Sequence, residues 1–137
     1  MFNIYLSCYI PPLETILPSY VKETYNVAQE IKAYLIDWNK MDGFPSITLY
    51  APAYYFGFVM PAWELGYIDE TAFRNISDVL IKGADLMISY GSYETDNMKE
   101  DVRIARINGI PIYFMQQINK PTIESLRFTI KLLLKSK

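Results

Sequence analysis

The chain of 137 residues contains no histidine and only one cysteine, Cys8. The lack of histidine excludes imidazole acid–base catalysis, Ser-His and Cys-His pairs and histidine-ligated zinc. A single cysteine excludes an internal disulfide and a multi-cysteine metal cluster, and this usage is typical of a cytoplasmic protein. We therefore expect no metal and no cofactor.

The chain also lacks an excess of positive charge, because it contains 13 basic and 15 acidic residues. Binding to a nucleic-acid backbone uses such an excess, so a nucleic-acid polymer is not an expected partner. The uncharged segment 43–63 contains Pro45, Pro52 and Pro61, which would break a membrane-spanning helix. Residues 1–10 lack the basic start of a secretory signal, so we expect no membrane and a cytoplasmic location.

Half of the residues are apolar (51%), which together with the length predicts one globular domain over residues 1–137. Short β-branched and aromatic runs alternate along it with segments of helical periodicity. The expected strands are 2–10, 47–51, 85–90 and 110–115, and the expected helices are 19–38, 71–82, 97–108 and 122–135. This order predicts an α/β fold with a mainly parallel, four- to five-stranded sheet and helices on both faces, a Rossmann-like or flavodoxin-like three-layer sandwich.

In such a sheet, ligands bind beyond the carboxyl ends of the strands, where the strand order reverses. The loops concerned are 7–12, 50–67 and 90–97, and none contains a G-x-G-x-x-G or P-loop pattern. In and beside these loops, we expect contacts to a small molecule from Ser7, Cys8, Tyr9, Pro52, Tyr54, Tyr55, Phe56, Tyr90, Gly91, Asn97 and Met98. The aromatic rings of the second loop suit stacking on a nucleobase, and they equally suit a packed lid or a subunit interface.

Asp101 is the unusual residue of the third helix. With Asn97 as the N-cap and Glu100 three residues later, the pattern predicts that Asp101 shares the inward helix face with Met98 and Ala105. A carboxylate there needs a polar cavity or a charged partner. Near the helix start, the dipole favours the ionised form, which suits a nucleophile or a hydroxyl acceptor. The structural alternative is an ion pair with one of three arginines, Arg74, Arg103 or Arg106.

Five segments of the chain form a recognisable set, namely IYLS from Ile4, ETYNVA from Glu23, YAP from Tyr50, GADLMI from Gly83 and TDNMKEDVRIARINGIP from Thr95. Together they resemble the nucleoside 2-deoxyribosyltransferase-like superfamily, and its small phage and bacterial members most closely, which implies a bacterial or phage-infected host cytoplasm. The last segment is similar to the family pattern S-x-G-M-x-x-E-x-x-x-A-x-x-x-G-x-P. Asn97 stands where the family has glycine, and Asp101 stands in place of its catalytic glutamate.

The resemblance implies cleavage of an N-glycosidic bond, in which a carboxylate captures the anomeric carbon and a second acid assists the leaving group. We expect Asp101 in the first role and Asp96 in the second, with Glu94 and Asp69 as other candidates. Asn26 is similar to a family residue near the ligand. Two alternatives stay open: a non-catalytic module that senses or sequesters a nucleotide-derived signal, and an assembly protein that needs no ligand.

We predict a homo-oligomer whose interface includes part of the segment 54–63, because large apolar segments of this kind usually mark binding surfaces. Sedimentation at micromolar concentration should therefore show a species larger than the 15.9 kDa chain. A monomer alone under those conditions would contradict the prediction.

Overall fold

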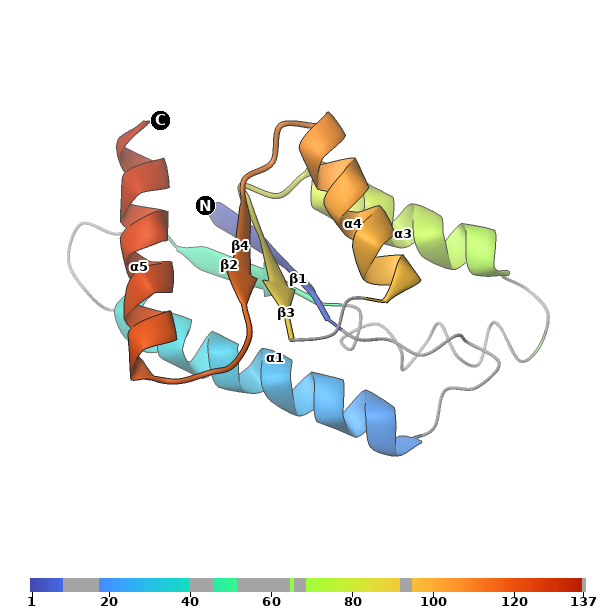
Figure 1. Ribbon diagram of the computed structural model, residues 1–137, viewed down its shortest axis with the longest axis horizontal. Helices are drawn as coiled ribbons and strands as arrows, with labels where there is room; N and C mark the ends of the chain where they lie inside the picture. The colour runs from blue at the N-terminus through green and yellow to red at the C-terminus, as the bar shows by residue number, and fades with distance from the viewer. Residues whose placement is uncertain (9–17, 40–45, 52–64, 66–68, 92–94, 137) are drawn as a thin grey trace.

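The computed structural model describes residues 1–8, 18–39, 46–51, 65, 69–91 and 95–136. In these residues, strands and helices alternate as the sequence predicts (Figure 1). The elements are β1 (Phe2–Ser7), α1 (Pro18–Asn39), β2 (Ile47–Tyr50), α3 (Glu70–Lys82), β3 (Leu86–Tyr90), α4 (Asp96–Ile107), β4 (Ile112–Met115) and α5 (Lys120–Lys135).

The four strands form one parallel sheet in the order β2-β1-β3-β4. β1 lies at its centre, because it pairs with β2 on one side and with β3 on the other. The chain moves outward from β1 to β2 and then crosses to β3, so the strand order reverses between β1 and β3. This topology confirms the predicted α/β fold of the Rossmann or flavodoxin-like type, in which that reversal point is the usual ligand site.

Helices cover both faces of the sheet, α1 and α5 on one side and α3 and α4 on the other (Figure 1). Side chains alternate along β1: Ile4 and Leu6 pack with α1 and α5, whereas Tyr5 packs with α3 and α4. This alternation is the ordinary period of two in a strand. It directs Ser7, two residues after Tyr5, to the face that α4 covers.

The start of α4 differs from the sequence prediction. Thr95, in extended conformation, is the N-cap, and its Oγ1 accepts a hydrogen bond from the Met98 backbone N–H at 3.2 Å. The predicted capping box of Asn97 with Glu100 is therefore wrong, and Glu100 instead pairs with Arg103. Threonine and asparagine both cap helices well, so local preference alone does not choose between them.

Two glycines with positive φ lie where the chain leaves a regular element. Gly91 lies at the end of β3, at the carboxyl edge of the sheet, and Gly109 lies just beyond α4, at the opposite edge. Gly91 follows β3 with a φ of 112°, and its N–H donates to the carbonyl of Met115 at 2.8 Å. Gly109 follows α4 with a φ of 69°, and the next N–H, of Ile110, turns back to the Ala105 carbonyl. Because that N–H is used by the turn and Pro111 has none, β4 begins at Ile112 rather than at the predicted Ile110.

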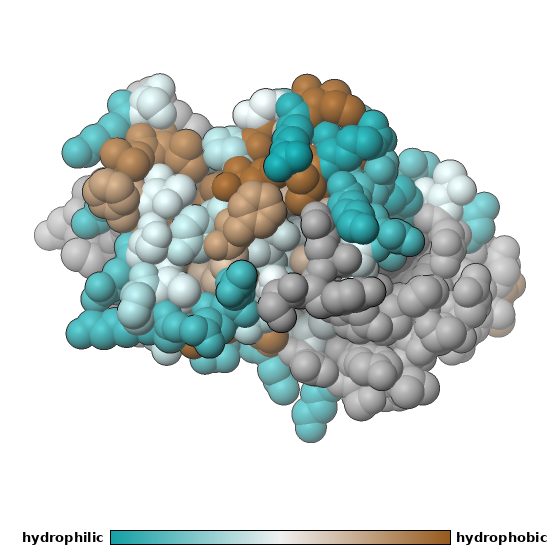
Figure 2. Space-filling model, in the orientation of Figure 1, coloured by the Kyte–Doolittle hydropathy of each residue, from teal (hydrophilic) through white to brown (hydrophobic). Residues whose placement is uncertain are grey.

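The surface around α4 is mixed in polarity (Figure 2). Hydrophilic residues lie over most of this helix, and a hydrophobic group lies at its carboxyl end, where Ile107 is exposed. Among the described residues, no helix has both the length and the apolar character that crossing a membrane requires.

The cap assignment predicts different costs for two neighbouring substitutions. Thr95→Ala removes the acceptor for the Met98 N–H and should lower the free energy of unfolding by about 1 kcal/mol. Asn97→Ala, inside the first turn, should change it by less than about 0.5 kcal/mol. Urea unfolding of both variants measures the difference, and a larger loss for Asn97→Ala would contradict the assignment.

Candidate functional site

The reversal point of the sheet is lined with small polar residues. Ser7 ends β1 and is paired in register with Ser89 of β3, and both residues are buried. Ser89 lies two residues after Met87, which packs with α3 and α4, so the strand period directs Ser7 and Ser89 to the same face. Polar residues thus replace the apolar core at the carboxyl ends of the two central strands.

Asp101 comes to this point from α4. The predicted inward face of the helix is confirmed, since Met98, Asp101 and Ala105 are all buried. Ser7 Oγ donates a hydrogen bond of 2.6 Å to Asp101 Oδ2. The carboxylate is 3% exposed as a residue and therefore requires compensation by neighbouring charges and donors.

Arg74 of α3 supplies the compensating charge. Its Nη2 lies 2.6 Å from Asp101 Oδ1, its Nε donates to Asp78 Oδ1 at 2.8 Å, and its Nη1 donates to the Asn97 carbonyl at 3.3 Å. Of the three arginines considered from the sequence, Arg74 is the one that pairs with Asp101, whereas Arg103 pairs with Glu100.

Arg74 Nη2 and Asp101 Oδ1 form a close ion pair at 2.6 Å. Asp101 Oδ1 is buried, and Arg74 is its partner within the described part of the chain. Of the two carboxylate oxygens, Oδ2 is thus hydrogen-bonded to the protein, and Oδ1 is charge-paired with acceptor capacity remaining.

Burial raises the pKa of Asp101 above its ordinary value, although the Arg74 charge and the Ser7 hydrogen bond act in the opposite direction. Burial thus opposes the preference for the ionised form that is expected near a helix start. Asp101 is the sixth residue of α4, and the dipole effect fades beyond the first turn. Partial burial lowers the pKa of Arg74, but the carboxylates of Asp101 and Asp78 outweigh it, so the pKa of Arg74 is raised above its ordinary value.

Cys8 follows Ser7 and is buried. Burial and the negative charge of Asp101 raise the pKa of its thiol to about 12. The thiol therefore stays protonated near neutral pH and is a poor nucleophile or metal ligand. Among the described residues, no three side chains of the metal-ligating kinds are grouped together.

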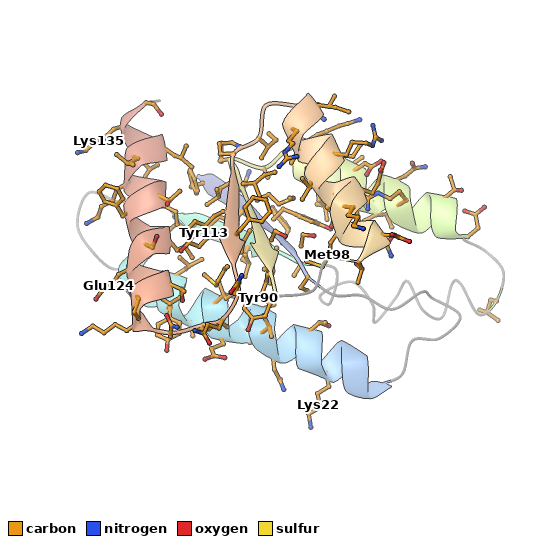
Figure 3. The ribbon with its side chains drawn as sticks, in the orientation of Figure 1. Lys22, Tyr90, Met98, Tyr113, Glu124 and Lys135 are labelled. Carbon is orange, nitrogen blue, oxygen red and sulfur yellow. The ribbon has the colours of Figure 1, made fainter. Side chains whose placement is uncertain are left out.

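Two of the expected ligand contacts, Asn26 and Tyr90, lie on the other face of the sheet from this polar group. Asn26 is exposed on α1, which covers the other face of the sheet. Tyr90 packs toward α1 and α5, and Figure 3 shows it beside α1, whereas Met98 lies at the start of α4 on the other face of the sheet. Gly91 is exposed at the end of β3, so it remains at the carboxyl edge without a side chain.

Asp96 and Asp69, two of the candidates for the second acid, lie at the starts of helices. Asp96 is exposed at the first position of α4, and Asp69 caps α3 by accepting from the Ala72 N–H at 2.9 Å. The carboxylate linked to Asp101 is Asp78, through Arg74. The helical spacing of Arg74 and Asp78, four residues apart, is the one sequence signal that could have identified this pair.

The remaining expected contacts, which are Tyr9, Pro52, Tyr54, Tyr55 and Phe56, lie outside the described residues, as does Glu94. The proposed interface segment 54–63 lies outside them too. Within the described part, hydrogen bonds and ion pairs join Ser7, Arg74, Asp78, Asp101 and the Asn97 carbonyl, and Cys8 lies near enough for the Asp101 charge to raise the pKa of its thiol. This group places a fixed, buried carboxylate and a shared cation at the reversal point of the sheet.

The raised pKa of Asp101 predicts the sign of a pH effect. The folded protein holds the Asp101 proton more tightly than the unfolded chain, so this contribution to stability is full below about pH 4 and is lost as the pH rises through the raised pKa. The free energy of unfolding of the wild type minus that of Asp101→Asn should therefore fall with rising pH, by up to about 1.4 kcal/mol per pH unit.

Glu100→Gln is the matched control, because the Arg103 hydrogen bond lowers the pKa of Glu100. The corresponding difference for Glu100→Gln should rise with pH near pH 4. Urea unfolding between pH 3.5 and 8 measures both differences. A wild type that gains stability over Asp101→Asn as the pH rises would show that the sign is wrong.

Comparisons of the chain with protein-family models, with curated proteins and with solved structures find no match. The fold assignment therefore rests on the sheet topology alone. The resemblance to the nucleoside 2-deoxyribosyltransferase-like superfamily stays a prediction from the sequence.

Proposed function

We propose that the protein binds a nucleoside or a nucleotide-derived small molecule at the carboxyl edge of its sheet, between β1 and β3. The observation that carries this proposal is the buried Asp101 carboxylate at the reversal point, whose Oδ1 is paired with Arg74 and retains one acceptor position. A carboxylate oxygen can accept two hydrogen bonds, so the remaining acceptor position of Oδ1, at a customary ligand position, supports a ligand that donates a hydrogen bond.

A sugar hydroxyl is the donor that suits this oxygen. It is neutral and small, and it would add a hydrogen bond without adding charge beside the Arg74–Asp101 pair. A ligand phosphate would bring negative charge to a carboxylate, so any phosphate group would lie away from Asp101. The aromatic segment expected to stack on a base follows β2, whose carboxyl end is at the same edge of the sheet.

Cleavage of the N-glycosidic bond is the second candidate, and the neighbours of Asp101 favour it. The Arg74 charge and the Ser7 hydrogen bond both stabilise the ionised carboxylate, which is the form that acts as a nucleophile. In that reaction the bond electrons leave with the base, a water or second acid supplies its proton, and Asp101 bonds to the anomeric carbon. Water then attacks that carbon, which releases the sugar and restores the carboxylate.

Asp101→Asn separates these uses of the carboxylate. If Asp101 accepts a sugar hydroxyl, the substitution should weaken binding about 5- to 150-fold, equivalent to about 1 to 3 kcal/mol. If it is a nucleophile, the substitution should preserve much of the affinity and abolish release of the base. Calorimetric titration and a base-release assay measure both effects.

The probes are adenosine, 2′-deoxyadenosine, thymidine and AMP, and Glu100→Gln is the control. That variant removes one charge from the adjacent, partly exposed position of the same helix and should behave as the wild type. The proposal fails if none of the four probes binds the wild type or raises its melting temperature. It fails equally if Asp101→Asn and wild type have the same affinity and the same turnover.

A further inference from the structure

Arg74 is the residue that connects the candidate site to the rest of the α3–α4 layer. Through one guanidinium, it contacts a side chain of its own helix, a backbone carbonyl of α4 and the Asp101 carboxylate. Its side chain is 21% exposed, whereas that of Asp101 is 5% exposed. The Arg74 guanidinium is thus partly exposed to solvent, whereas the Asp101 carboxylate that it contacts is buried.

The three contacts restrict the guanidinium in different directions. Asp78 holds Nε from one side at 2.8 Å, and the Asn97 carbonyl holds Nη1 near the start of α4. With these two nitrogens fixed, Nη2 is directed toward Asp101 Oδ1 because a guanidinium is planar and rigid. Ser7 holds the other carboxylate oxygen, so the orientation of the Asp101 carboxylate is fixed from both ends.

We propose that Arg74 is the positioning residue of this site, and that Asp78 controls how strongly its charge acts on Asp101. Arg74 holds the carboxylate in place against Ser7 at the end of β1 and offsets the cost of its negative charge. Asp78 shares the same cation, so its negative charge competes with Asp101 for Arg74. The role of Asp101 toward a ligand rests on the proposed function, whereas this coupling exists in the ligand-free protein.

The groups that influence Asp101 come from each neighbouring element. α3 contributes Arg74 and Asp78, and the residue after β1, Cys8, contributes a thiol that stays neutral near pH 7. β1 also contributes Ser7, and Tyr5 lies in the apolar cluster of the same face. On α4 itself, Glu100 and Arg103 pair with each other on the exposed side. The two charges of α3 are therefore the ones that substitution can change selectively.

The test uses two substitutions with opposite expected signs. Arg74→Gln removes the cation and should raise the titration midpoint of Asp101 by about one pH unit or more, as expected for loss of an adjacent opposite charge. Asp78→Asn removes the competing anion and should lower that midpoint. The midpoint is measured from the ¹³C chemical shift of the Asp101 carboxyl in the full-length, ligand-free protein, and Asp101→Asn assigns the signal.

Two further variants make the result specific. Arg74→Lys keeps the charge without the planar fork and should give a midpoint between those of wild type and Arg74→Gln. Arg103→Gln removes an arginine that pairs with Glu100 and should leave the Asp101 midpoint unchanged. A merely structural arginine would not produce opposite shifts from the Arg74 and Asp78 substitutions.

The proposal is overturned if Arg74→Gln leaves the midpoint unchanged or lowers it, or if Asp78→Asn raises it. If Arg74→Gln does not fold, Asp78→Asn and Arg74→Lys decide the question by the same signs. Affinity for the tightest-binding of the four probes, measured at pH 7, tests the proposed function separately. Wild type that binds no probe refutes that function, while the titrations still decide the role of Arg74.

Discussion

Burial of the Asp101 carboxylate is the constraint on which the arrangement of the site depends. An isolated carboxylate in a protein interior is too costly to maintain, so its position requires a donor and a cation close by. Ser7 of β1 and Arg74 of α3 meet that requirement at 2.6 Å each. One charged group on α4 thereby ties together the central strand and the two helices of one face.

The same arrangement divides one cation between two acids. Arg74 contacts Asp78 on the partly exposed side and Asp101 on the buried side. Because burial dominates at Asp101, its pKa is raised even with Arg74 beside it. The charge state of the buried acid is therefore set by a balance among three groups rather than by one strong pair, and a ligand hydroxyl at Oδ1 would act on that balance.

The position of this group follows from the sheet topology. Parallel strands leave their carboxyl ends at one edge, and the reversal between β1 and β3 separates the connections that would otherwise cover it. At that edge Ser7 and Ser89 replace apolar side chains on the α4 face, while Leu6 and Ile88, one residue earlier on each strand, still pack in the core of the other face. A shift of β1 by one residue in its register would direct Ser7 to the other face of the sheet, away from Asp101.

The sequence alone determined the alternation of strands and helices, the parallel sheet and the inward face of α4, because these depend on the local periodicity of apolar residues. It also singled out Asp101, since a carboxylate in an apolar stripe needs a partner. Only the tertiary structure chose Arg74 over Arg103, showed that Ser7 reaches Asp101, and separated Tyr90 and Asn26 from it. Ser7 and Asp101 lie 94 residues apart in the sequence, and contacts at such separation follow from strand order and packing rather than from local propensity.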